Sequence, residues 1–207
     1  MRIHVVDYGA GNVKSVCVAL ERIGAAPFLT ANPSDLAGAD RIILPGVGAA
    51  GHAIQSLRRS GFADALERRV RRDGVPMLGI CVGMQVLAER LFELGEHKGL
   101  GWVAGDVRAL SNLGVSKLRI PHTGWNDILP AAENDAALGR STRERLFYFN
   151  HGFALHADDC TVSARVEYGQ KLVAALRFDS IWAVQFHPEK SQQNGLRLLA
   201  AFADWQP

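Results

Sequence analysis

The first half of the chain alternates between short apolar runs and longer stretches in which apolar residues recur at helical spacing. The runs of strand length lie at residues 3–6, 27–30, 40–44 and 75–81. Helical spacing covers residues 12–23, 50–72 and 84–90. This alternation predicts an α/β fold with a doubly wound, mostly parallel sheet and flanking helices. Ligands of such sheets bind at the carboxyl ends of the strands.

Strands dominate the second half of the chain. The candidate strands lie at residues 106–110, 146–150, 161–167, 172–177 and 181–186, ahead of an amphipathic helix at 192–204. The Gly and Asp turns between them predict an added antiparallel, strand-rich region. The chain of 207 residues is long enough for one sizeable core, and we find no repeat or linker in it. We therefore expect a single domain over residues 1–207.

Composition and charge indicate an ordinary soluble enzyme or binding protein. Hydrophobic residues make up 48% of the chain and the formal net charge is +2. The arginine clusters at 58–59 and 68–72 lie in helical patterns and indicate solvated faces, so we expect no nucleic-acid partner. No apolar run has membrane-spanning length, and residues 1–7 read as a strand rather than a signal peptide. We expect a cytoplasmic protein without a membrane partner.

The cysteines and the first glycine turn argue against a metal or nucleotide cofactor. Cys17, Cys81 and Cys160 form no C-x-x-C pair, which argues against a zinc ribbon or a disulfide framework. Cys17 shares a helical face with apolar residues and is expected to pack in the core. The turn at 9–15 resembles a phosphate loop, but Lys14 stands where the dinucleotide fingerprint needs glycine. We expect neither metal nor cofactor, and a close backbone approach at this turn.

Cys81 lies in the frame Gly79-Ile80-Cys81-Val82-Gly83, between an apolar run and a helical pattern. This is the thiol form of the strand–turn–helix that exposes a nucleophile, because the flanking glycines leave room for a tight, strained turn. The helix start favours negative charge on the sulfur, and the Val82 N–H can stabilise an oxyanion. The alternative is a small core cysteine, which is the usual role of a cysteine between Ile and Val.

A candidate base follows far along the chain. His187 comes directly after the apolar run 181–186, and Pro188 prevents further strand pairing. Glu189 lies two residues on, where its carboxylate can orient the imidazole. Cys81, His187 and Glu189 thus form a candidate catalytic triad. Taken alone, His187 is equally well explained as a strand-end histidine bonded to water or backbone.

These motifs resemble a known family. Residues 79–85 and 185–189 are similar to those of the class I, triad-type glutamine amidotransferases. The resemblance narrows to the glutaminase subunits of imidazole glycerol phosphate synthase through D-Y-G-A-G-N at 7–12, L-P-G-V-G at 44–48, P-H-T-G-W-N at 121–126, F-Y-F at 147–149 and H-P-E-K-S-Q at 187–192. The resemblance spans the whole chain.

The resemblance implies an activity and a partner. Such subunits hydrolyse L-glutamine to glutamate and ammonia without a cofactor, in a heterodimer with a (β/α)₈ cyclase subunit. The ammonia is used there to form imidazole glycerol phosphate and aminoimidazole carboxamide ribotide in histidine biosynthesis. Two alternatives stay open: a paralogous glutaminase that supplies a surface-sugar amination enzyme, and an inactive subunit that only activates its partner.

The resemblance also assigns residues. Val47 and Gly48 join Val82 in the oxyanion site, where a loop peptide reorients on partner docking and thereby gates hydrolysis. The implied substrate contacts are Gly46, Gln85, Glu93, His151 and Gly152. The implied partner interface and ammonia gate are Asn12, Trp125, Tyr148 and Lys190, although Trp125 is alternatively a core residue and Lys190 a solvated charge. Asn150 and Gly152 depart from the residues that the family commonly carries there.

Overall fold

The computed structural model describes residues 1–132, 135, 137–139, 141–157 and 161–207, so Cys160 lies outside the described residues. The strands are β1 (Ile3–Val6), β2 (Pro27–Thr30), β3 (Arg41–Gly46), β4 (Met77–Cys81), β5 (Ala88–Leu91), β6 (His97–Lys98), β7 (Val103–Ala109), β8 (His122–Pro130), β9 (Leu146–His151), β10 (Phe153–Ala157), β11 (Val162–Glu167), β12 (Lys171–Phe178) and β13 (Ile181–Val184). The α-helices are α1 (Val13–Arg22), α2 (Ala50–Arg59), α3 (Phe62–Leu66), α4 (Val82–Gln85) and α5 (Gln192–Asp204). Short 3₁₀ or π turns are η1 (Pro33–Gly38), η2 (Glu67–Arg72), η3 (Leu110–Leu113), η4 (Thr142–Arg145) and η6 (Pro188–Lys190).

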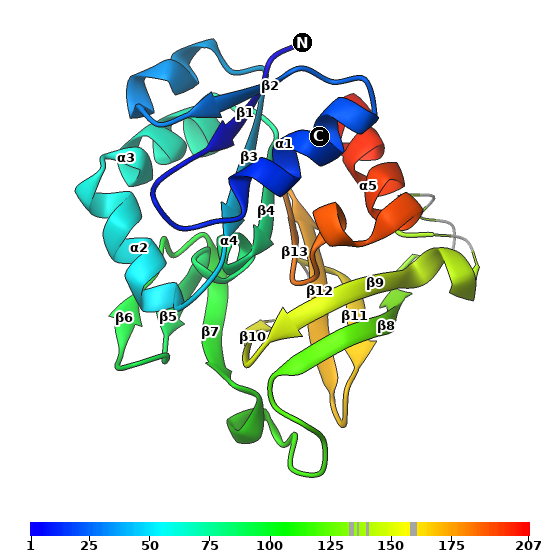
Figure 1. The fold of residues 1–207 in the computed structure, drawn as a ribbon. Coiled ribbons are helices and arrows are strands. Elements are labelled where there is room, and N and C mark those ends of the chain that lie inside the picture. Colours follow the sequence, from blue (N-terminus) through cyan, green and yellow to red (C-terminus); the bar gives the residue numbers. More distant parts are fainter. Residues whose placement is uncertain (133–134, 136, 140, 158–160) are drawn as a thin grey trace.

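A large mixed sheet forms the centre of the molecule (Figure 1). Its nine strands in the described residues run in the order β2-β1-β3-β4-β13-β12-β11-β8-β9. The pairs from β2 to β13 are parallel, and those from β13 to β9 are antiparallel. A smaller sheet has the order β10-β7-β5-β6. This confirms the α/β fold class with its added antiparallel region.

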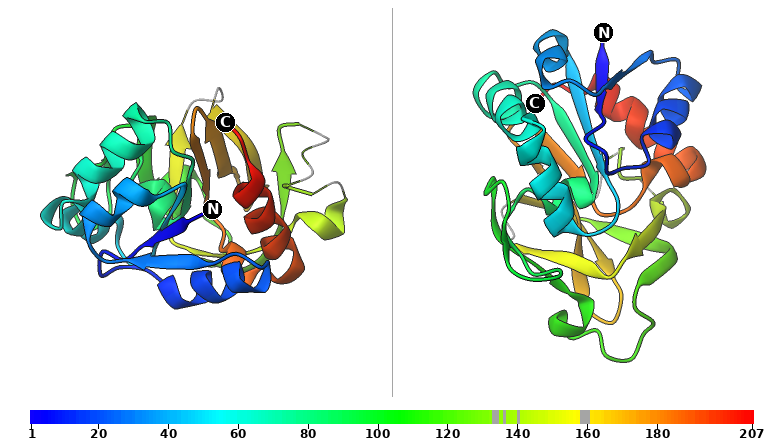
Figure 2. Two further views of the ribbon diagram at one scale, coloured as in Figure 1. Left: turned by 90° about the horizontal axis from the view of Figure 1, so that it is seen from above. Right: turned by 60° about the vertical axis from the view of Figure 1, so that its left-hand side comes forward.

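Helices cover both faces of the parallel half (Figure 2). Helices α1 and α5 lie together on one face, and α2 and α3 lie on the other. Each packs through a stripe at helical spacing: Ala50, Ala53, Ile54 and Leu57 are buried in α2, and Gly195, Leu198, Leu199 and Phe202 in α5. Helix α5 has the bounds that the sequence predicts.

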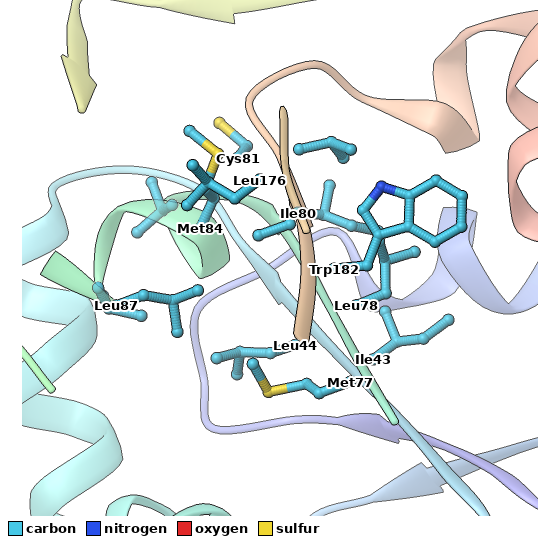
Figure 3. Close-up of a cluster of buried hydrophobic side chains, with 14 of the residues drawn as sticks. Ile43, Leu44, Met77, Leu78, Ile80, Cys81, Met84, Leu87, Leu176 and Trp182 are labelled. Atoms are coloured by element: carbon cyan, nitrogen blue, oxygen red, sulfur yellow. The ribbon is translucent and has the colours of Figure 1, made fainter. Parts of the chain in front are cut away.

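The core beneath Cys81 is assembled from adjacent parallel strands. Figure 3 shows Ile43 and Leu44 from β3 near Leu78 and Ile80 from β4, with Trp182 of β13 beside them. These side chains are at most 1% exposed. Truncation of one such side chain to alanine typically costs 2–5 kcal/mol, roughly, in the free energy of unfolding. The strands that carry the candidate triad therefore stand on a closely packed base.

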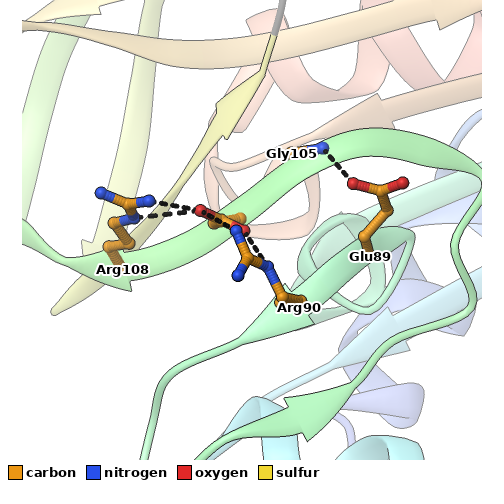
Figure 4. A network of polar contacts seen from close by, with 5 residues as sticks. Glu89, Arg90, Gly105 and Arg108 are labelled. Atoms are coloured by element: carbon orange, nitrogen blue, oxygen red, sulfur yellow. Dashed lines mark hydrogen bonds and ion pairs between the residues drawn. The ribbon is translucent and has the colours of Figure 1, made fainter.

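The prediction of a helix at residues 84–90 is wrong. The chain forms a single turn, α4, and then leaves it to enter strand β5. Strand β5 pairs with both β6 and β7. The Arg90 guanidinium forms an ion pair with the Asp106 carboxylate at 2.9 Å, and the same carboxylate also binds Arg108 (Figure 4). Local spacing favoured a helix, but pairing with β6 and with the more distant β7 decided the structure.

The sequence analysis did not predict some of the other strands and placed the end of one too far along the chain. Strands β6, β8 and β10 were not predicted, because they are short or carry Gly and polar residues that break the alternation. Strand β13 ends at Val184 rather than at Phe186. The N–H of Gln185 still donates to the Ala174 carbonyl at 2.9 Å, so the chain keeps strand-like contact just beyond β13.

Gly83 should be essential to this fold. A Cβ added there would collide with the Leu44 carbonyl oxygen. We expect Gly83→Ala to lower the free energy of unfolding by about 3 kcal/mol, measured by urea titration. Gly38→Ala is the control, because its Cβ would meet only the mobile guanidinium end of Arg2, and it should change stability by less than about 0.5 kcal/mol. Equal stabilities of the two variants would refute this account of the turn.

Candidate active site

Cys81 sits on a strained turn at the end of β4. Its backbone has φ 55° and ψ −109°, a conformation that costs a non-glycine residue of the order of 1–3 kcal/mol. A Cβ at Gly79 would meet the Gly83 carbonyl oxygen at 2.8 Å, so the two glycines allow the turn to fold onto itself. This confirms the expected strand–turn–helix at Cys81.

Parallel pairing of β4 with β13 brings the triad residues together. The register places Ile80 opposite Val184, so Cys81 and the segment leading to His187 emerge at the same edge of the sheet. The Cys81 side chain is close enough to the His187 imidazole to affect the pKa of that ring. The other ring nitrogen, Nδ1, lies 2.8 Å from Oε1 of Glu189, and the side chains of His187 and Glu189 are 2% and 1% exposed. His187 is therefore next to both Cys81 and Glu189, and the three groups form one row.

The electrostatics of this row favour a charged imidazole. Burial disfavours the imidazolium, but the interactions with Cys81 and Glu189 outweigh it and raise the pKa of His187 to about 9. At neutral pH His187 is thus charged, and an imidazolium next to a cysteine sulfur favours a thiolate–imidazolium pair. Such a pair is the reactive state of a cysteine nucleophile, because the thiolate attacks and the thiol does not.

A pocket of about 360 Å³ opens over Cys81. Its lining includes these predicted site residues: Val47, Gly48, Cys81, Val82, Gln85, Glu93, His151, Gly152, His187 and Lys190. Glu189 lies behind His187, outside this lining. Gly46 lies beneath it, where an added Cβ would meet the Gly83 nitrogen at 2.8 Å and the Tyr8 hydroxyl at 2.9 Å. Segments far apart in the sequence thus converge on one pocket.

Glu93 holds the loop that precedes α2. Its Oε2 accepts the N–H of Ala50, the first residue of α2, at 2.9 Å. This satisfies one of the free donors at the helix start and fixes the chain just after Gly48. The sequence suggested Glu93 as a substrate contact, and the structure adds this role in holding the loop.

A buried pair of neutral histidines lies at one wall of the pocket, where His151 lines it and His122 contacts His151. Nδ1 of His122 lies 3.1 Å from Nε2 of His151, and Nδ1 of His151 lies 2.8 Å from the Phe153 carbonyl. The His122 ring stacks on those of Phe149 and Tyr168. Burial lowers the pKa of His122 to about 4 and, as the main cause, that of His151 to about 3. Both rings are therefore neutral near pH 7.

Tyr148 joins the outer edge of the sheet to the triad. Its carbonyl accepts the N–H of His187 at 2.9 Å. Its ring lies edge-on to Trp125 at 6.0 Å, and the Lys190 ammonium lies 5.9 Å from the ring centre. Trp125 is 46% exposed, so the alternative of a core tryptophan is wrong. These three side chains form a contiguous aromatic and basic group beside the pocket.

The remaining predicted residues have local roles. Asn12 accepts the Ser15 hydroxyl at the start of α1 and lies outside the pocket lining. Asn150 accepts the Thr123 hydroxyl across β8 and β9. Cys17 packs against the core as expected. The backbone of Pro45 lies against Gly11, at φ 156°, which confirms the close approach expected at the first glycine turn.

Two polar residues of this region escaped the sequence analysis as site candidates. Gln185 is fully buried, and its Nε2 donates to Sγ of Cys81 at 3.6 Å. His122 supports His151. The available signal was a polar residue inside an apolar run, since a buried amide or imidazole requires partners.

Within the described residues, no group of three or more His, Cys, Asp or Glu side chains is placed to hold a metal ion. In that same part of the chain, no helix combines the length and apolarity that a membrane span requires.

The histidine pair should make stability fall in acid. The unfolded chain binds a proton at His122 near pH 6.5 and the folded chain only near pH 4, so the stability from this site is complete above pH 6.5 and is lost as pH falls towards 4. For His122 alone the loss at pH 5 is about 2 kcal/mol. We expect His122→Phe, which can keep the ring stacking, to reduce the drop in unfolding free energy between pH 7.5 and 5 by about that amount in urea titrations. His52→Gln on the exposed side of α2 is the control, and an unchanged drop in His122→Phe would contradict the assignment.

Comparison with known proteins agrees with this geometry. The family model for class-I glutamine amidotransferases matches residues 4–204. The fold is similar to a crystal structure described as glutamine amidotransferase (22% identity, TM-score 0.75, 98% of this chain and 97% of the other). It is also similar to PurLQS from Thermotoga maritima (21%, TM-score 0.74, 98% and 97%). At these identities the two structures support the fold.

Relatives of known name are closer in sequence. Imidazole glycerol phosphate synthase subunit HisH 1 of Campylobacter jejuni is 44% identical over 201 residues, which is 97% of this chain and 98% of the relative. Subunit HisH of Zymomonas mobilis is 43% identical over 210 residues, covering 99% and 96%. The chain therefore belongs to the class-I glutamine amidotransferases and, within them, to the glutaminase subunits of imidazole glycerol phosphate synthase.

Proposed function

We propose that Cys81 is the nucleophile that releases ammonia from glutamine. The Sγ thiolate attacks the side-chain carboxamide carbon and forms a C–S bond. The C–N bond then breaks, and the His187 imidazolium gives its proton to the departing nitrogen, which leaves as ammonia. Water, deprotonated by His187, attacks the thioester carbon, and cleavage of the C–S bond yields glutamate and restores the thiolate.

Glu189 acts in this proposal by holding His187. The carboxylate fixes the ring through Nδ1, so that the other nitrogen faces the sulfur, and it stabilises the imidazolium. The observation that carries the proposal is the row of Cys81, His187 and Glu189, in which Cys81 and His187 line the pocket and Glu189 binds His187 from behind.

The oxyanion of the tetrahedral intermediate needs donors beside the sulfur. We assign the Val82 N–H as one donor and a peptide N–H of the loop at Val47 and Gly48 as the other. Val47 is 40% exposed, and a Cβ at Gly48 would meet nothing within 4 Å, so this loop has space to reorient. Loop reorientation on partner binding would switch hydrolysis on.

The substrate's amino-acid end is assigned to the far side of the pocket. Gln85, His151 and Gly152 line it, with Glu93 near the loop and Gly46 beneath. Glu93 has the charge to bind the substrate ammonium. Oε1 of Gln85 is suited to accept from the substrate ammonium as well. Both N–H donors of the Gln85 amide are already bound by protein acceptors, so the oxygen is the part of the amide left for the substrate.

The partner of this subunit is assigned as a (β/α)₈ cyclase in a heterodimer. Relatives at 43–44% identity are named as subunits of imidazole glycerol phosphate synthase, which supports an ammonia-using partner in histidine biosynthesis. Trp125, Tyr148 and Lys190 are proposed to face it and to line the ammonia route, with Asn12 at its margin. Their exposed aromatic and basic character suits a protein interface.

Removal of the sulfur should separate the two half-reactions. In the reconstituted heterodimer, we expect Cys81→Ser to lower glutamine-dependent cyclisation by at least about 1,000-fold while ammonium-dependent cyclisation stays within twofold, roughly, of the unaltered complex. Cys17→Ser is the matched control and should keep both activities. Retained glutamine use by Cys81→Ser would exclude Cys81 as the nucleophile.

The loop proposal predicts dependence on the partner. Glutamine hydrolysis by the isolated chain should be slow, and the cyclase with its bound ligand should raise kcat by about 100-fold, the usual value of one oxyanion donor. Glutamate release in a coupled assay measures both rates. Equal rates for the isolated chain and the complex would disprove gating through this loop.

A further inference from the structure

Gln185 places a buried amide donor on the nucleophile. Its side chain is fully buried just beyond β13, and its Nε2 donates to Cys81 Sγ at 3.6 Å. Gln185 is not part of the pocket lining, so it touches the sulfur from the protein side. An N–H donor next to sulfur favours the thiolate over the thiol, because it stabilises the negative charge without exchanging a proton.

The orientation of this amide follows from a neighbouring carbonyl. The Phe153 carbonyl can only accept, so Gln85 turns its NH₂ group towards it, at 3.0 Å. The second N–H of Gln85 donates to Oε1 of Gln185 at 3.0 Å. Gln185 must therefore present its oxygen to Gln85 and its NH₂ group to the sulfur of Cys81.

The same carbonyl is held firmly in place. Phe153 belongs to β10, whose register pairs it with Ala109 of β7. Its oxygen also accepts the Nδ1–H of His151 at 2.8 Å, and His151 Nε2 then accepts from His122 Nδ1. The Phe153 carbonyl thus sets the direction of two series of hydrogen bonds. One runs through Gln85 and Gln185 to the sulfur, and the other runs through His151 to His122 of strand β8.

We propose that Gln185 is a positioning residue for the glutaminase reaction: it holds the Cys81 thiolate for attack through an N–H whose direction is imposed by Gln85 and the Phe153 carbonyl. The inference rests on the proposed role of Cys81 as nucleophile. The helix after Cys81 has only one turn, so its dipole is weak, and the amide supplies the stabilisation that a longer helix would give.

The test measures the reactivity of the sulfur without substrate. The full-length chain and its variants are alkylated with iodoacetamide from pH 5 to 9, and modification of the Cys81 peptide is followed by mass spectrometry, which separates it from Cys17 and Cys160. We expect Gln185→Met to lower the rate at pH 7 by about tenfold and to move the midpoint of the pH profile up by roughly one unit. Gln170→Met, an exposed glutamine, is the control and should match the unaltered chain.

Kinetics of the reconstituted heterodimer add a second readout. Because Gln185 lies outside the pocket lining, Gln185→Met should lower kcat for glutamine by about tenfold with KM changed less than about twofold. Gln185→Asn keeps an amide that is too short to reach the sulfur, and it should behave as Gln185→Met does.

A double-mutant cycle tests the imposed orientation. Gln85→Met frees Gln185 to turn and should itself slow alkylation, whereas adding it to Gln185→Met should bring no further loss. Additive losses would overturn the orientation step.

The outcomes separate this inference from the proposed function. Folding of Gln185→Met and Gln185→Asn is checked by far-UV circular dichroism. If a folded variant shows unaltered alkylation of Cys81, the role of Gln185 is overturned while the proposed triad stands. Full glutamine-dependent activity in Cys81→Ser would instead remove the nucleophile itself, and with it the proposed function.

Discussion

The parallel pairing of β4 with β13 is the interaction on which the site depends. These strands are separated by about half the chain, yet their register sets Ile80 opposite Val184 and brings Cys81 and His187 out at one edge. Both strands are buried along their whole length, so a register slip would bring side chains of different size into closely packed space on both faces. The packing free energy of the core therefore also holds Cys81 and His187 at the same edge of the sheet.

Strain and close packing meet at the same turn. Cys81 holds a left-handed backbone that a cysteine rarely adopts, and Gly79 and Gly83 remove the side chains that would prevent it. The stable sheet beneath absorbs this cost. The loop of Val47 and Gly48 is exposed and has space to move, so the site joins a rigid turn at Cys81 to an adjustable loop.

Hydrogen-bond direction is the second constraint on the site. Buried carbonyl oxygens accept and never donate, so a single fixed carbonyl at Phe153 decides which way two glutamine amides and two imidazoles point. Strand β8 carries both His122 and the exposed Trp125, and β9 carries Tyr148, whose carbonyl binds His187. The outer strands thus contact His187 and His151 through a main-chain hydrogen bond from β9 and a buried side chain from β8.

The sequence by itself determined the alternating α/β plan, the glycine frame of Cys81 and the identity of His187 and Glu189, because these depend on local spacing and on residue chemistry. The helix at 84–90, strands β8 and β10, and the contact of Gln185 with the sulfur were decided by tertiary structure alone. Residues 84–90 have helical spacing, but residues 88–91 pair instead with β6 and β7, which supply the backbone hydrogen-bond partners that a helix would otherwise provide. The direction of a buried amide depends on acceptors supplied by distant strands, and no local pattern in the chain encodes which carbonyl will face it.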